Sequence, residues 1–123
     1  MNNKVKEVIV QVWPIVVVVL VINLLWRQTY LLLAIEVFAA FSQILIGRDK
    51  ILEGKIMLYG FIWGTVLEVA SVNFGGFHVF LKTDLMNIPL WLPAIWGYGF
   101  FIAKRIASIV YTGSPYLNNK LNQ

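Results

Sequence analysis

The chain has 123 residues, of which 59% are hydrophobic and only 13% are charged, and its mean hydropathy is +0.76. Soluble domains carry about a quarter charged residues, and a chain this short leaves much of its surface facing solvent. The composition therefore excludes a disordered chain and an ordinary soluble enzyme, and it favours the bilayer as solvent. The absence of cysteine excludes disulfides and thiolate metal sites.

The first apolar run, residues 8–26, contains no charged residue. A helix needs about 20 apolar residues to cross the roughly 30 Å hydrocarbon core of a bilayer, so this run is long enough. Its many valines are typical of a strand in water, but a lone strand in lipid leaves backbone groups unpaired, and we expect a helix. The run is too long for a signal peptide and no small-residue cleavage site follows it, so we interpret it as a retained span.

The second run, residues 28–47, follows almost without a break. One helix over both runs would be about 60 Å long, twice the thickness of the hydrocarbon core. The chain must therefore turn near residues 26–29 and form a tight helical hairpin. Residues 48–55 are charged and contain glycine, which predicts a loop.

Two more spans are predicted in the second half of the chain. The third run covers residues 56–80 and is interrupted by two adjacent glycines, which often mark a helix end or a kink. A loop at 82–84 leads to the fourth run, residues 88–103, where Pro89 suits the first helical turn. Residues 112–123 are polar, which predicts a poorly ordered tail.

The basic residues predict the topology. With four spans, eight of the ten Lys and Arg residues fall on one side of the membrane: Lys4, Lys6, Arg48, Lys50, Lys55, Lys104, Arg105 and Lys120. The other side holds only Arg27 and Lys82. This division follows the positive-inside rule, whereas three spans would scatter the same charges over both sides. The sequence thus predicts an all-α, single-domain bundle of four transmembrane helices in the cell membrane, with both termini in the cytoplasm.

Two carboxylates lie inside predicted spans, Glu36 in the second and Glu68 in the third. A charge at the bilayer centre costs on the order of 3 kcal/mol or more, so such residues normally face the bundle interior and are often functional. The helical rise places Glu36 about 12 Å below the outer surface of the hydrocarbon core and Glu68 about 18 Å above the inner surface. In a core of about 30 Å these depths are nearly the same and lie close to the midplane. We predict both as catalytic residues. The alternative is that each is neutral and hydrogen-bonded, and only holds helices together.

Small and polar residues recur at helical spacing around each carboxylate. The second span carries Glu36, Ala40, Gln43 and Gly47, and the third carries Gly64, Glu68, Ser71 and Gly75. Small residues let helices approach closely, so we expect the two faces to meet. One of the two carboxyl groups would then be protonated, because two close carboxylates in a low dielectric do not both ionise cheaply. Such a pair would supply an acid and a base, or a proton-coupled cation site.

Five further residues are predicted to bind a ligand near this pair: Ser71, Asn73, His78, Trp91 and Trp96. His78 is placed to relay protons, and the two tryptophans to form a wall against an apolar ligand. Each has an ordinary structural alternative: hydrogen bonding to a loop for the polar residues, and an interfacial aromatic belt for the tryptophans.

The stretch 64–105 resembles a pattern found in small, mostly uncharacterised polytopic membrane proteins. It is also similar, more distantly, to the carotenoid hydratase family of integral membrane proteins. In that family a Glu-bearing helix leads to a Phe-Gly-x-aromatic segment, and the next helix opens with Pro-x-x-x-Pro-x-x-Trp. The matching positions here are Glu68, Phe74-Gly75-Gly76-Phe77, Pro89, Pro93 and Trp96. The resemblance implies an acid, Glu68, that protonates an isoprenoid double bond.

Together these features predict a small integral membrane protein whose intramembrane polar pocket binds or modifies an apolar lipid or isoprenoid by acid–base chemistry. One alternative is a proton- or cation-coupled transporter or channel that acts as a homo-oligomer. Another is a non-catalytic accessory subunit of a larger membrane complex. No cofactor is expected, because nucleotide-binding motifs are absent from the sequence, and one histidine and two carboxylates are too few ligands to predict a metal site. Nucleic acid is not an expected partner, since the basic residues flank apolar runs.

Overall fold

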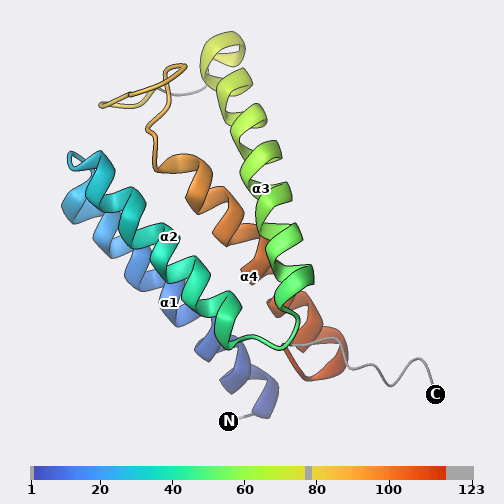
Figure 1. The fold of residues 1–123 in the computed structure, drawn as a ribbon. Coiled ribbons are helices and arrows are strands. Elements are labelled where there is room, and N and C mark those ends of the chain that lie inside the picture. Colours follow the sequence, from blue (N-terminus) through green and yellow to red (C-terminus); the bar gives the residue numbers. More distant parts are fainter. Residues whose placement is uncertain (1, 77–78, 116–123) are drawn as a thin grey trace.

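The computed structural model describes residues 2–76 and 79–115, and the named elements in this part of the chain are all helices (Figure 1). The elements are α1 (Asn3–Leu25), α2 (Thr29–Ile46), α3 (Lys50–Ala70), the π-helical turn η1 (Ser71–Gly75) and α4 (Leu92–Thr112). The predicted turn near residues 26–29 is confirmed, since α1 ends at Leu25 and α2 begins at Thr29. Residues 77–78, which include the predicted site residue His78, lie outside the described residues.

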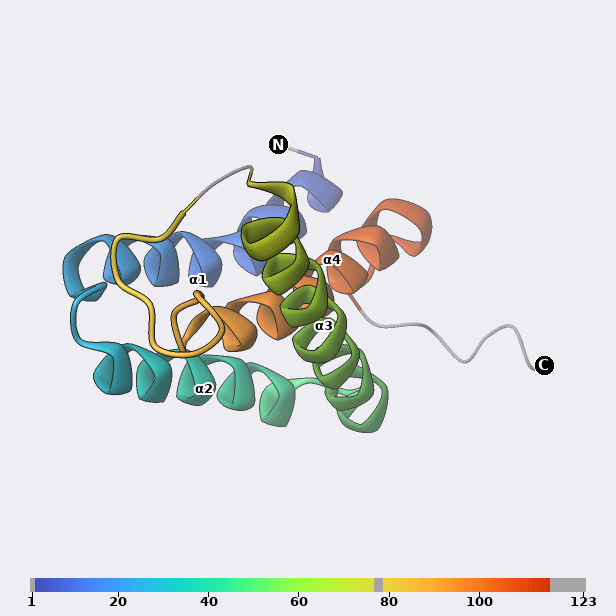
Figure 2. The same ribbon diagram turned by 90° about the horizontal axis from the view of Figure 1, so that it is seen from above.

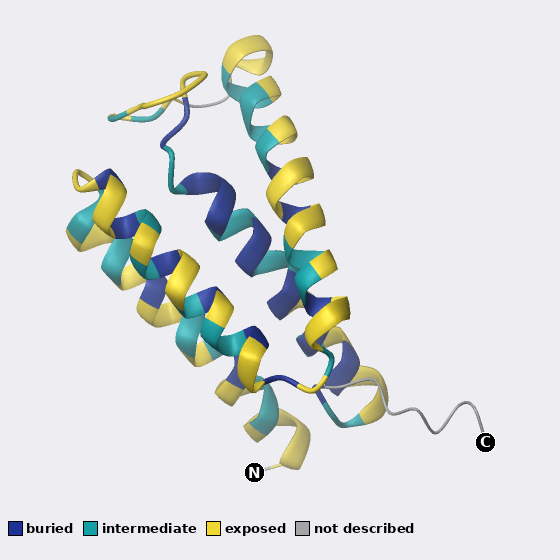
Figure 3. Cartoon of the chain, in the orientation of Figure 1, coloured by how far each residue is buried: buried dark blue, intermediate teal, exposed yellow. Residues whose placement is uncertain are grey.

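In the part of the chain that the structure describes, three helical segments are long and apolar enough to cross a membrane: Asn3–Leu25, Thr29–Ile46 and Lys50–Gly75. Their outer faces carry large apolar side chains that the bundle leaves uncovered (Figure 3). Trp13 is 64% exposed and Phe38 is 76% exposed. Apolar surface of this extent is an aggregation hazard in water but is the ordinary state of a helix in contact with lipid. The structure therefore agrees with a membrane protein built from these helices.

Helix α4 is the core of the bundle. It contacts each of the other three helices, most extensively α3, and it lies among them when the bundle is seen from above (Figure 2). Its residues Tyr98, Phe101 and Ile102 pack with Val18 of α1 and Ala40 of α2 in one buried cluster. Ten of the 21 residues of α4 are buried in protein, more than in α1, α2 or α3.

Several predicted boundaries are corrected. The segment 48–55, expected as a loop, is helical from Lys50 onward, because Glu53 turns inward to a buried partner instead of requiring water. The fourth helix begins at Leu92 and continues to Thr112, well past the expected end at residue 103. Lys104 and Arg105, which directly follow the predicted fourth span, lie inside this helix and are paired with carboxylates. The helix then ends at Gly113, in the left-handed conformation with φ +79°.

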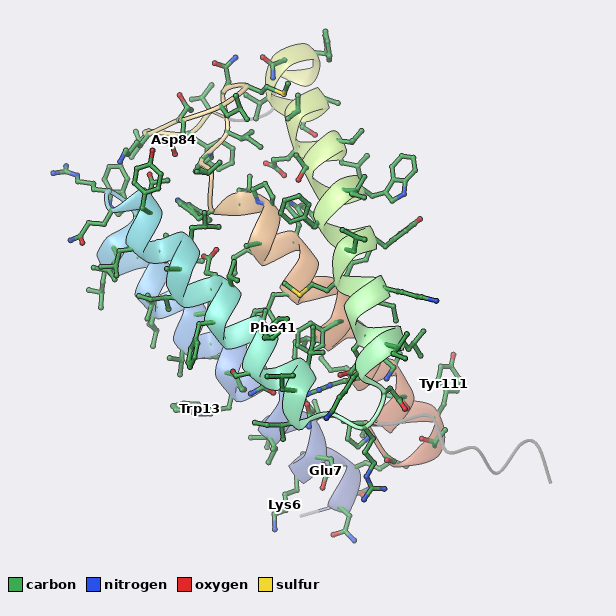
Figure 4. All side chains as sticks on the ribbon, in the orientation of Figure 1. Lys6, Glu7, Trp13, Phe41, Asp84 and Tyr111 are labelled. Atoms are coloured by element: carbon green, nitrogen blue, oxygen red, sulfur yellow. The ribbon has the colours of Figure 1, made fainter. Side chains whose placement is uncertain are left out.

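The glycine pair ends the third helical segment. η1 stops at Gly75, and Gly76 adopts a left-handed φ of +60°, so no helix continues to residue 80 as the third run had predicted. The connection to α4 is held by polar contacts. Asp84 accepts hydrogen bonds from the Thr29 hydroxyl at 3.1 Å and from the Leu90 N–H at 3.0 Å. This connection is therefore fastened over the start of α2, where Figure 4 labels Asp84.

The N-terminus, the α2–α3 turn and the last turns of α4 lie at the same end of the bundle (Figure 1). We call this the basic end, and its described Lys and Arg residues are Lys4, Lys6, Arg48, Lys50, Lys55, Lys104 and Arg105. The opposite end holds the α1–α2 turn and the α3–α4 connection, which carry Arg27 and Lys82.

Candidate functional site

Glu36 lies in the interior. Its exposed fraction is 0%, and neither carboxyl oxygen has a hydrogen-bond partner among residues 2–76 and 79–115. It shares one face of α2 with Ala40 and Ile44, and both of those pack in the cluster that contains Tyr98. The hydroxyl group of Tyr98 is also buried without a partner. A buried carboxylate with no partner costs several kcal/mol, so Glu36 requires a proton or a bound positive group.

Glu68 lies in a different setting. It is half-buried on α3, in the same i, i+4 row as Gly60 and Gly64. These glycines pack on α4: an added Cβ at Gly60 would lie 2.6 Å from Phe100, and one at Gly64 would collide with Trp96. The faces of α2 and α3 that were predicted to meet are thus both directed at α4. No hydrogen bond joins Glu68 to Glu36, whose oxygens are both unpaired.

Asn73 fastens a loop. Its amide group donates to the carbonyl of Val69 at 2.8 Å and to that of Met86 at 3.1 Å, and its oxygen accepts from Asn87 at 2.6 Å. Met86 and Asn87 both have positive φ, 49° and 64°, so these contacts hold a backbone conformation that most residues avoid. Asn73 is exposed and Ser71, at the start of η1, is half-buried. The contacts of Asn73 therefore support the alternative role given above, hydrogen bonding to a loop, and not ligand binding.

The two tryptophans occupy separate places. Trp96 packs against Gly64 of α3, with its ring centroid 6.3 Å from that of Phe100. Trp91, just before α4, lines a cavity of about 260 Å³ near the α3–α4 connection. Its other lining residues are Trp26, Val79, Phe80, Leu81, Lys82 and Pro89. The predicted residues thus do not converge on one pocket in the described part of the chain.

A buried polar cluster at the basic end was missed by the sequence analysis. Its centre is the Arg105 guanidinium group, 2% exposed, which receives a side chain from each of the other three helices. Nε and Nη2 donate to the two carboxylate oxygens of Glu53 on α3, both at 2.7 Å. Nη1 donates to Oε1 of Gln11 on α1 at 3.0 Å and to Oε1 of Gln43 on α2 at 3.3 Å. We call these four residues, Gln11, Gln43, Glu53 and Arg105, the arginine cluster.

The fifth hydrogen bond of Arg105 runs from Nη2 to the backbone carbonyl of Gln43, 2.8 Å away in the last turn of α2. The guanidinium group has five N–H donors, and these five bonds provide an acceptor for each of them. A positive charge at this position also matches the negative end of the α2 dipole. The site needs a glycine at residue 47, because an added Cβ there would lie 2.6 Å from Oε2 of Glu53 and 2.7 Å from Nη2 of Arg105.

A second pair of charges borders the arginine cluster. The Lys104 ammonium group lies 3.0 Å from Oδ2 of Asp49 and 3.4 Å from Oε1 of Glu53. Two glutamines inside predicted spans were the sequence signal for this cluster, since uncharged polar groups in lipid also need partners. The sequence does not reveal that Gln11 and Arg105, which are far apart along the chain, belong to the same hydrogen-bonded cluster.

An apolar groove runs between α2 and α3 near the same end. Its volume is about 440 Å³, in the range of ligand pockets. Residues from the last turns of α2 and the first turns of α3 line it: Phe41, Ile44, Leu45, Lys50, Ile51, Gly54, Met57, Leu58 and Phe61. Figure 4 labels Phe41 on α2. All but Lys50 are apolar, so the groove suits a hydrocarbon chain.

Comparison of the chain with protein-family models, with curated proteins and with solved structures gives no match. Within the described residues, the structure defines a helical protein with three helical segments that are long and apolar enough to cross a membrane.

Proposed function

We propose that this chain is a four-span integral membrane protein, with both termini in the cytoplasm, that binds an apolar lipid or isoprenoid chain in the α2–α3 groove. The central position of α4 supports the fourth span, because a helix enclosed by three lipid-facing helices crosses the membrane with them. The gathering of basic residues at one end supports the orientation.

The observation that carries the lipid-binding proposal is the groove itself. It opens between two helices whose outer faces are apolar, so a hydrocarbon chain can enter it from the bilayer. Gly54 lies in its wall, and an added Cβ there would meet no other atom within 4 Å. The groove is therefore open at Gly54 instead of being filled by a neighbouring helix.

The geometry favours binding of the lipid or isoprenoid chain over its chemical modification. The nearest groove-lining residue of α2 is Phe41, five residues after Glu36, and this corresponds to about 7.5 Å along the helix. An acid must come within hydrogen-bond reach of the group that it protonates. Isoprenoid chemistry of the kind that the hydratase resemblance implies thus requires a ligand that extends from the groove to Glu36 or Glu68.

The test is lipid retention by purified protein, measured by native mass spectrometry. We expect the wild type to carry a lipid or isoprenoid and Gly54→Leu, which fills the groove, to lose it. Gly99→Leu is the matched control, because Gly99 is also a helical glycine with open space at its Cβ but lies on α4, outside the groove. Equal retention by wild type and Gly54→Leu would overturn the proposal.

A second function, a proton- or cation-coupled transporter acting as a homo-oligomer, is favoured by the buried, unpartnered carboxyl group of Glu36. Intramembrane ionisable groups are common in proton and ion pathways. Proteoliposomes with an imposed proton gradient test it. Ion flux that disappears in Glu36→Gln would support transport, and the absence of flux in the wild type would exclude it.

A further inference from the structure

A second cavity adjoins the apolar groove at the basic end. It is lined by Arg48, Asp49, Lys50, Ile51 and Leu52, and its volume is also about 440 Å³. Lys50 and Ile51 line both this cavity and the groove. The two spaces therefore share this wall: one is almost wholly apolar and the other carries the charged residues of the α2–α3 turn.

The charges around this second cavity leave an excess of positive charge. The carboxylate of Asp49 is neutralised by Lys104, 3.0 Å away, and Glu53 of the next helical turn is paired with Arg105 at 2.7 Å. Arg48 and Lys50 add two positive groups at exposed positions. Basic groups therefore outnumber acidic ones around the cavity, which makes it complementary to an anion.

An apolar groove beside a basic cavity fits a molecule with a hydrocarbon tail and an anionic head. We propose that the two spaces together bind an anionic glycerophospholipid of the cytoplasmic leaflet. One acyl chain lies in the groove, the Lys50 ammonium group donates to the phosphate, and Arg48 adds positive charge beside it. This inference rests on the proposed function and names the class of lipid and the group that recognises its head.

Native mass spectrometry of the full-length protein, titrated with phosphatidylglycerol or phosphatidylcholine of identical acyl chains, tests the inference. A basic side chain near the membrane surface favours an anionic lipid by about fivefold. We expect the wild type to prefer phosphatidylglycerol by at least this factor, and Lys50→Gln to reduce the preference by about the same factor. Lys55→Gln is the matched control: it removes the same charge from an exposed position of α3 that lines neither cavity.

The outcomes separate the two proposals. Loss of both lipids in Gly54→Leu, with the preference intact in Lys50→Gln, would overturn the anionic-lipid site and leave chain binding in the groove standing. Equal binding of both lipids to wild type and Gly54→Leu would overturn the groove and the headgroup site together. A preference reduced equally by Lys50→Gln and Lys55→Gln would indicate a general charge effect and would also contradict the inference. Helical circular dichroism of each variant verifies that it folds.

Discussion

Arg105 and Glu36 are both ionisable side chains buried within one small bundle, yet their surroundings are opposite. Arg105 makes five hydrogen bonds to groups from α1, α2 and α3. Glu36 makes none. A buried charge whose donors are all satisfied fixes how four helices meet, whereas a buried carboxyl group without partners contributes nothing to holding them. The first is a structural centre, and the second is where a function beyond stability is to be sought.

The largest effect is expected from breaking the arginine cluster. Arg105→Met leaves Glu53 buried without its bidentate partner, and removing one partner of a buried ion pair costs about 3–5 kcal/mol. Unfolding of the detergent-solubilised protein by SDS, followed by circular dichroism, measures this free energy. The double variant Arg105→Met with Glu53→Leu should recover much of the loss, because no uncompensated charge remains. A double variant as unstable as the sum of the two single variants would contradict the pairing.

Crowding the arginine cluster should have the next largest effect. Gly47→Ala places a Cβ within 2.7 Å of both Glu53 and Arg105, and overpacking of this kind costs about 1–3 kcal/mol. The same SDS titration measures it. Gly54→Ala is the control, since its Cβ enters open space and the change should be neutral or slightly stabilising. Equal stability of the two variants would show that the cluster is looser at Gly47 than the structure indicates.

A smaller effect is expected at the edge of the cluster. The ion pair of Lys104 with Asp49 is partly exposed, with side-chain exposures of 12% and 22%. Pairs that water reaches contribute about 0–1 kcal/mol, and salt screens them. Asp49→Asn should therefore lower the free energy of unfolding by less than about 1 kcal/mol. The difference from the wild type should narrow at high salt, and a loss as large as that of Arg105→Met would place Asp49 within the arginine cluster.

The smallest loss is expected at Glu36. Replacing an unpartnered buried carboxyl group by an apolar side chain removes an unfavourable group and breaks no hydrogen bond, so Glu36→Leu should be neutral or stabilising. Glu53→Leu is its counterpart inside the arginine cluster and should cost about 3–5 kcal/mol. SDS titration of the two variants side by side measures the contrast. Equal destabilisation would mean that Glu36 has a stabilising partner, and it would contradict the contrast drawn between Glu36 and the arginine cluster.

Much of the fold could be predicted because its signals are local. A continuous apolar run and the thickness of a bilayer together place α1 and α2 and the turn between them. The extent of α4 could not be predicted in this way, because Lys104 and Arg105 look like the end of a span in the sequence. They lie inside the helix only because Glu53 and Asp49 receive them, and that pairing depends on tertiary contacts more than 50 residues apart in sequence.

The candidate site was harder to predict than the fold. Helical spacing correctly places Glu36 on a buried face of α2, but it does not indicate which helix that face meets. Small residues on α2 and α3 predicted that these two helices pack closely on each other. In the structure, Gly60 and Gly64 of α3 contact α4 instead. Glu53 and Glu36 are both fully buried, but only Glu53 has Arg105 and Lys104 within reach, and no local pattern reveals these partners.

The account depends most on α4 crossing the membrane inside the other three helices, and cysteine accessibility tests this directly. The chain has no cysteine, so Asn3→Cys, Leu81→Cys and Gln123→Cys each introduce a single reactive thiol. In sealed cells, a membrane-impermeant maleimide should label Leu81→Cys, and should label Asn3→Cys and Gln123→Cys only after the membrane is opened. Labelling of Gln123→Cys together with Leu81→Cys in sealed cells would mean that only three segments cross the membrane, and it would contradict the account.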